Sequence, residues 1–200
     1  MSINMALPKH GITEDTPKNI LLGAGTWFKN LKYTTNSGWG GTVLGATSGG
    51  SSIKIAPEVK DIEIDGALAL AMGLAVMQGG SGEAEVNFAE INADVIKMTT
   101  LGKVLSETDD GYVEGFDCIQ TKNKIEAGDY VENLGFVGYT ADQSKAIIVI
   151  LDYALCKSGF QIDPKNKENA VIKATFTAYG GIDTDLDRVP IRIYYPKATA

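Results

Sequence analysis

The chain has 200 residues, a formal net charge of −7 at pH 7 and 44% hydrophobic residues. This composition supports one domain with a sizeable core and excludes a chain that is disordered throughout. The negative net charge argues against a protein that binds nucleic acid tightly, because phosphate binding needs clustered Lys and Arg side chains.

The N-terminal residues 1–18 are predicted to form an arm, because they are mixed polar residues with prolines. They lack the basic segment and long apolar segment of a secretory signal. The longest apolar stretch, "GALALAMGLAVM", is too short and glycine-rich to cross a bilayer as a helix. We therefore expect a protein made in a cytoplasm with no membrane partner, with one domain over residues 19–195 and a tail over residues 196–200.

The first predicted strand is "NILLGAGTWF", residues 19–28, which is apolar and then aromatic. Residues 34–52 ("TTNSGWGGTVLGATSGGSS") are rich in Gly, Ser and Thr, and we expect a long loop there. Loops of this length inside a compact domain are uncommon and are usually functional or mobile.

The stretch "IKIAPEVKDIEI", residues 53–64, alternates apolar and polar residues, but the alternation changes sides at Lys60-Asp61. A bulge, bend or turn is expected at that point, because strand side chains alternate with a period of two. Pro57 indicates an edge strand or the same bend. Asp65-Gly66 is typical of a turn.

Residues 67–82 are apolar and small, which favours a strand or an extended hairpin arm, with a short helix as the alternative. Residues 83–91 alternate as a half-buried strand does. One side of that strand carries Glu83, Glu85 and Asn87, and the other carries Ala84, Val86 and Phe88.

Residues 92–102 give the clearest helix signal. Asn92 is a suitable N-cap, Asp94 suits the positive end of the helix dipole, and Gly102 suits the position after the C-cap. One apolar face is formed by Ile91, Val95, Met98 and Leu101.

The remainder is predicted to be β-structure, and evenly spaced strands favour a β-sandwich or barrel with one short flanking helix. The expected strands are residues 111–120, 130–139, 145–154, 170–179 and 188–195. The run "KAIIVILDYAL" is apolar on both sides, so we expect a helix or another subunit to cover its second face.

No catalytic, cofactor or metal residue is predicted, and we expect a protein that is not an enzyme. His10 is the single histidine, and no nucleophile or phosphate-loop motif is present. "DTDLD" opens like a calcium loop, but Arg188 follows where that loop needs glycine. The role of these acids, Asp183, Asp185 and Asp187, stays open. Asp109-Asp110-Gly111 is interpreted as a turn rather than an acid/base pair, and Cys118 and Cys156 as buried thiols, with a disulfide as the alternative.

Several blocks in order resemble the tail tube (major tail) proteins of tailed bacteriophages. They are "LLGAGTWF", "LGATSGGSSIKIAPEVKDIEIDG", "AEVNFAEINADVIKMTTLG", "AIIVILDYAL" and "AVIKATFTAYGG". The resemblance implies a β-sandwich with a flanking helix, and a structural virion protein in the tail, assembled in the host cytoplasm. Six subunits would form a ring whose inner sheets join into a larger β-barrel. Stacked rings would surround a tape measure protein, meet other tail proteins and let DNA pass without specific binding.

Two groups of residues are the candidate functional sites. We expect a lumen-facing group of Glu63, Glu83, Glu85 and Asn87. Contacts between subunits or rings are expected from the arm and the long loop, at Pro8, Pro17, Trp39, Leu44 and Ser48. Two alternatives stay open: a monomeric β-sandwich binding module, for instance for carbohydrate, and an enzyme that uses carboxylates as acid and base.

Overall fold

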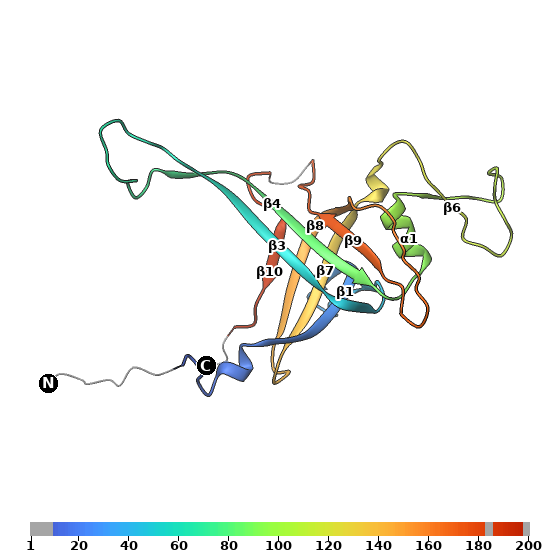
Figure 1. Ribbon diagram of the computed structural model, residues 1–200, viewed down its shortest axis with the longest axis horizontal. Coiled ribbons are helices and arrows are strands. Elements are labelled where there is room, and N and C mark those ends of the chain that lie inside the picture. Colours follow the sequence, from blue (N-terminus) through green and yellow to red (C-terminus); the bar gives the residue numbers. More distant parts are fainter. Residues whose placement is uncertain (1–9, 183–185, 198–200) are drawn as a thin grey trace.

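The computed structural model describes residues 10–182 and 186–197, and in these residues the fold is mainly β (Figure 1). It has one large antiparallel sheet of eight strands, a second sheet of two short strands and one short α-helix. The strands of the large sheet are β1 (Leu21–Thr34), β2 (Gly38–Val43), β3 (Thr47–Asp61), β4 (Ala75–Phe88), β7 (Val131–Thr140), β8 (Ala146–Cys156), β9 (Ile172–Thr177) and β10 (Ile191–Tyr194). The helix is α1 (Ala93–Thr100), the small sheet pairs β5 (Lys103–Val104) with β6 (Ile119–Gln120), and 3-10 turns occupy Thr16–Lys18 and Ala127–Asp129.

The large sheet runs in the order β2-β1-β7-β8-β9-β4-β3, and β10 also pairs with β8. Residues 148–151 of β8 pair with β10, while its last two residues pair with β9. Side chains from both parts of the sheet enter one core. This core contains Trp27, Phe136 and Leu151 from β1, β7 and β8, then Val86, Phe88 and Phe176 from β4 and β9, with Val95 and Met98 from α1. The sheet therefore curves around a shared core, and its end strands β2 and β3 keep free edges.

The second face of β8 is covered by the chain itself. Beyond its pairing with β7, β1 continues into a hairpin with β2. Leu31 of this hairpin packs against Ile148 and Ile150, and Trp39 adds to the same cluster. The prediction that both faces of this strand are buried is confirmed. Its cover is the β1–β2 hairpin, so this face needs no second subunit.

The predicted loop over residues 34–52 is wrong. Most of this segment is β2 and the beginning of β3, joined by a turn and a short link. Pairing of β2 with β1 overrides the loop preference of small residues, because the backbone hydrogen bonds do not depend on side chains. Gly38, with a φ of 74°, adopts the left-handed conformation that glycine favours where β2 begins.

The β3–β4 segment matches the sequence pattern in part. The edge position implied by Pro57 is confirmed, since β3 ends the sheet. The irregularity in pairing lies between Glu58 and Val59, slightly before the expected position. Residues 62–64 lie outside the strand, the turn at Asp65-Gly66 is confirmed, and the helix alternative for residues 67–82 is wrong.

Residues 111–120 are also mostly loop, because only Ile119 and Gln120 pair, with β5. Asp109 holds the beginning of this loop by accepting hydrogen bonds from Lys103 Nζ and from Ser106. The expected turn at Asp110-Gly111 is confirmed. A local carboxylate network thus takes the place of strand pairing.

Helix α1 is confirmed, and its N-cap ties it to the strands. Asn92 Oδ1 accepts a hydrogen bond from the amide of Val95 (2.9 Å), and Asn92 Nδ2 donates to the carbonyl of Leu44 (2.9 Å). Gly102 follows the C-cap as predicted, while the left-handed conformation is taken by the C-cap residue Leu101 itself, with a φ of 50°. Gly102 is buried against Ile119, where a side chain would collide.

We predict that Asn92→Ala lowers the free energy of unfolding by about 1–2 kcal/mol, because the helix loses its cap and Leu44 loses a hydrogen bond. Urea denaturation followed by circular dichroism measures this. Asn123→Ala, in an exposed loop, is the matched control and is expected to change stability by less than about 0.5 kcal/mol. Equal effects of the two variants would contradict the role of the cap.

Candidate functional site

The most distinctive surface is the hairpin arm, which we define as residues 56–81 (Figure 1). β9 pairs with β4 only over residues 83–88, so beyond that point β3 and β4 have only each other. At the base of the arm, Val189 and Ile191 pack against Gly80 and Gly82, where any larger residue would collide. The arm is therefore fixed at its base and projects from the body without a core of its own.

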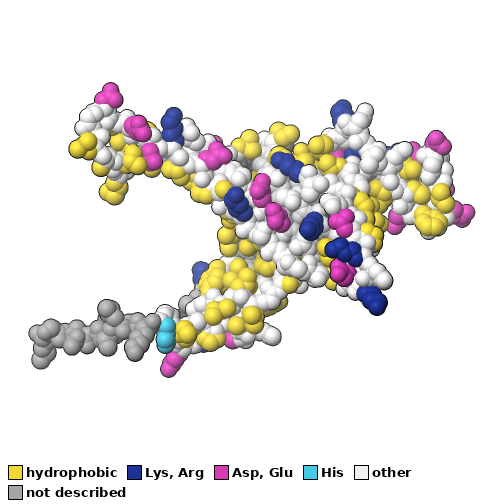
Figure 2. Space-filling view, in the orientation of Figure 1, with side chains coloured by type: hydrophobic (Ala, Val, Ile, Leu, Met, Phe, Trp, Pro, Cys, Tyr) yellow, Lys and Arg dark blue, Asp and Glu magenta, His cyan; other side chains and the backbone are white. Residues whose placement is uncertain are grey.

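The end of the arm, residues 62–74, is the tip loop and is strongly apolar. Leu68 and Met72 are fully exposed (106% and 104% of their reference areas). The loop surrounds a hollow of about 450 Å³, and Figure 2 shows hydrophobic side chains along the arm and at its end. Other exposed apolar residues of the arm are Val59, Ile62, Ile64, Leu70, Val76 and Met77. A contiguous exposed apolar surface of this kind is typical of an interaction site.

The tip is also acidic. Asp61, Glu63 and Asp65 are exposed there, and Lys60 is the nearest cation along the chain. None of the three carboxylates has an ion-pair partner within the described residues. The tip therefore offers apolar side chains together with uncompensated negative charge.

The outer face of β4 carries the alternation predicted for residues 83–88. Glu83, Glu85 and Asn87 lie opposite the buried Ala84, Val86 and Phe88. Lys54 of β3 stands beside Glu83, and Lys173 of β9 stands beside Asn87. This face is therefore of mixed charge rather than acidic.

Glu63 does not belong to this group. It lies in the tip loop, beyond the end of β3, so the structure separates it from Glu83 and Glu85. The strand pattern was extended too far along the chain, because β3 ends at Asp61.

The predicted contact residues lie in different environments. Leu44 is 1% exposed and its amide donates to the carbonyl of Trp27, so its assignment to a subunit contact is wrong. Trp39 is half-buried, and its ring contacts those of Tyr33 and Tyr194. Ser48 and Pro17 are exposed. Pro8 lies outside the described residues.

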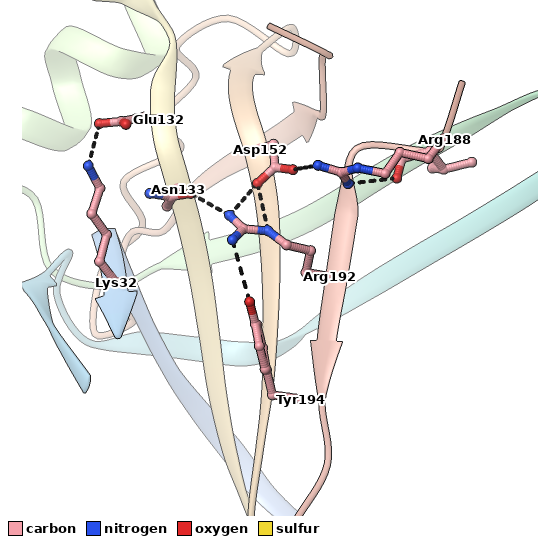
Figure 3. Close-up of polar contacts among 8 residues, drawn as sticks. Lys32, Glu132, Asn133, Asp152, Arg188, Arg192 and Tyr194 are labelled. Atoms are coloured by element: carbon pink, nitrogen blue, oxygen red, sulfur yellow. Dashed lines mark hydrogen bonds and ion pairs between the residues drawn. The ribbon is translucent and has the colours of Figure 1, made fainter. Parts of the chain in front are cut away.

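A polar cluster holds β10 against β8 (Figure 3). Asp152, buried in the middle of β8, accepts hydrogen bonds from Arg188 and Arg192, and Arg192 also donates to Asn133 Oδ1 (2.7 Å). Hydrogen bonding to Asp152 raises the pKa of Arg192, against the opposing effect of burial. The cluster borders a cavity of about 440 Å³. Since each carboxylate oxygen of Asp152 is bonded to an arginine, its role is that of a structural ion pair.

The described residues contain no group of three or more His, Cys, Asp or Glu side chains that could hold a metal ion. Asp187 is described, while Asp183 and Asp185 are not. Asp109, bonded to Lys103 and Ser106, has a pKa lowered to about 2 and remains a carboxylate at neutral pH. Cys156 is buried, Cys118 is half-buried and both are free thiols, so the disulfide alternative is wrong.

Sequence reasoning missed two features. The strand or extended hairpin arm predicted for residues 67–82 is confirmed for residues 75–82, which belong to β4, but the exposed loop at residues 67–74 was not foreseen, although its run of small and apolar residues lacks polar alternation. The ion cluster had a signal too, because Asp152 interrupts the apolar run "VILDYAL" and a buried carboxylate needs partners.

No protein-family model and no curated protein matches this chain. Among the described residues, none of the helices has the length and apolar character required to span a bilayer.

We predict that Asp152→Ala lowers the free energy of unfolding by about 2 kcal/mol, between the values for exposed and fully buried ion pairs, because two arginines lose their partner. Hydrogen exchange should quicken most at residues 191–194 of β10. Glu168→Ala, which removes an exposed pair with Lys165, is the control and should have little effect. Unchanged exchange in β10 would show that the cluster does not hold this strand.

Proposed function

We propose that this protein is a structural subunit of a bacteriophage tail tube, which self-associates into stacked rings of six around a channel for DNA. The tip of the hairpin arm carries the proposal, since its apolar side chains are exposed in the single chain. A folded protein keeps such a surface where another molecule covers it. The block order that resembles tail tube proteins favours a second copy as that molecule.

The free edges of the sheet support the same proposal. β2 and β3 each pair on one side only, which leaves rows of backbone donors and acceptors. Exposed edges of this kind favour pairing with another chain, and a closed ring of subunits removes them. In the proposed ring, edge pairing between neighbours extends the sheet around the channel.

The channel lining in this proposal is the outer face of β3, β4 and β9. Glu83 and Glu85 alternate there with Lys54 and Lys173, among Ser52, Thr175 and Thr177. Two carboxylates and two ammonium groups compensate each other, so passing DNA meets a polar wall without a basic cluster that would retain phosphate.

A monomeric binding module is the second candidate. It is favoured by an open groove with the aromatic side chains of Tyr33, Trp39 and Tyr194, since aromatic rings stack on sugar faces. The state of association separates the two functions, because a binding module remains a monomer at high concentration.

We predict that the purified protein forms rings or tubes as its concentration rises, as measured by light scattering with size-exclusion chromatography and by negative-stain microscopy. The double substitution Leu68→Ser and Met72→Ser should reduce this assembly strongly and leave stability within about 0.5 kcal/mol, since both side chains are fully exposed. Val113→Ser with Phe116→Ser, in another exposed loop, is the control. A protein that stays monomeric at every concentration tested would overturn the proposed function.

We further predict that Glu83→Lys with Glu85→Lys preserves folding and assembly but makes the tubes retain DNA. Together with Lys54 and Lys173 the face would then carry four ammonium groups, and affinity for DNA at low salt should rise about tenfold and fall steeply with added salt. Retention of labelled DNA by tubes at several salt concentrations measures this. Glu107→Lys with Glu114→Lys, in the exposed loop before β6, gives the same change of charge elsewhere. Equal retention by both pairs would place the channel on another face.

A further inference from the structure

The exposed apolar side chains of the tip loop need a surface that covers them, and a groove on the body of the molecule has the size and the aromatic lining for this. It lies between the β1–β2 hairpin and the end of β10, holds about 550 Å³ and is lined by Tyr33, Trp39, Ile148, Tyr194, Tyr195 and Pro196, with Lys145 at its edge. The rings of Trp39 and Tyr194 are 4.9 Å apart and meet edge to face. We call it the aromatic groove. Tyr33, Trp39, Ile148 and Tyr194 belong to paired strands, so most of the groove is formed by the sheet of the single chain.

The charge of the groove complements that of the tip. Lys145 Nζ donates to Asn19 Oδ1 (3.0 Å) and lies against the Tyr195 ring, at 5.5 Å from its centre. Among the described residues its hydrogen-bond partners are uncharged groups, and the carboxylate of Asp15, which pairs with Lys18, is near enough to attract it electrostatically. The tip carries Glu63 and Asp65, which also lack an ion pair there. Among the described residues, the tip is an apolar protrusion whose carboxylates form no ion pair, and the groove is an aromatic hollow whose ammonium group forms none, so the two surfaces complement each other.

One chain cannot join its own tip to its own groove. Figure 1 shows the end of the arm far from the segment that follows β10 and leads to the C-terminus, and Tyr195 and Pro196 lie in that segment. The arm is fixed at its base by the packing of Val189 and Ile191 on Gly80 and Gly82. A contact between these two surfaces therefore joins two copies.

We infer that the tip loop of one copy docks into the aromatic groove of the next, with Leu68, Leu70 and Met72 as the inserted apolar set and Glu63 or Asp65 beside Lys145. The inference rests on the proposed function and names the surface that receives the arm. Because the two surfaces differ, the contact is head-to-tail, and repetition of it propagates a chain of copies or closes a ring.

Reversal of the charges tests this contact. Lys145→Glu and the double substitution Glu63→Lys with Asp65→Lys should each raise the concentration needed for association about tenfold, which corresponds to about 1.4 kcal/mol. The combination of all three should restore it, because the opposite charges again face each other. Lys124→Glu, an exposed lysine in a loop, is the control for net charge, and Lys145→Gln controls for the lost hydrogen bond. Absence of restoration in the combined variant counts against the contact.

A cross-link provides the second measurement. In a Cys118→Ser background, Leu70→Cys and Ser144→Cys should form a disulfide between copies on mild oxidation, while Leu70→Cys with Asn166→Cys should not. Cross-linked dimers support the contact even if no tubes form. The absence of tubes in that case would overturn the proposed function but not the contact between tip and groove. Tubes without this cross-link would overturn the inference and leave the proposed function standing. A tip that instead binds phosphatidylcholine vesicles, with the groove variants inert, would also overturn it.

Discussion

The burial of β8 on both faces is the constraint around which the rest of the structure is arranged. One face meets the core that β4, β9 and α1 complete, and the other meets Leu31 and Trp39 of the β1–β2 hairpin. The edges of β8 are also used, by β7 on one side and by β10 and β9 on the other. Asp152 is a polar residue in this strand, and two arginines from the C-terminal part compensate it. The hydrophobic effect thus gathers distant parts of the chain around one strand.

The molecule combines a body, which has buried clusters on both faces of β8, with an arm that has no core of its own. In the body, described side chains that are buried and polar all have hydrogen-bond partners. In the arm, the internal support is backbone hydrogen bonding, between β3 and β4 and within the tip loop, and many apolar residues are exposed. Such a division separates the part that supplies stability from the part available to a partner.

The sequence predicted the elements whose signals are local. The alternation at residues 83–88 and the cap at Asn92 gave β4 and α1, and the doubly apolar run gave β8. Elements that depend on distant pairing were missed. β2 is built from glycine and small residues, and only the presence of β1 beside it makes it a strand. Leu44 was assigned to a surface for the same reason, since the core it enters is formed by residues far along the chain.

The candidate site, too, depends on distant parts of the chain and was therefore predicted only in part. Composition marked residues 67–82 as unusual but did not show that the tip would stand clear of the body, because exposure depends on what packs nearby. The aromatic groove was not visible at all, since Tyr33, Trp39, Lys145 and Tyr194 come from four separate segments. Of these four, Trp39 was predicted as a contact residue, and no pattern in the sequence linked it to the other three.

The unsupported part of the hairpin has a further consequence, which concerns length. From Ala56 to Asp61 the two strands pair only with each other, and at about 3.3 Å per residue this part extends roughly 20 Å. In an assembly whose copies contact each other through the tip, the length of the arm would determine the spacing of successive copies. Loss or gain of one paired residue on each strand would change the spacing by about 3.3 Å and move the side chains beyond that point to the opposite face of the hairpin. The number of residues in this one hairpin would thus set the repeat distance of the assembly.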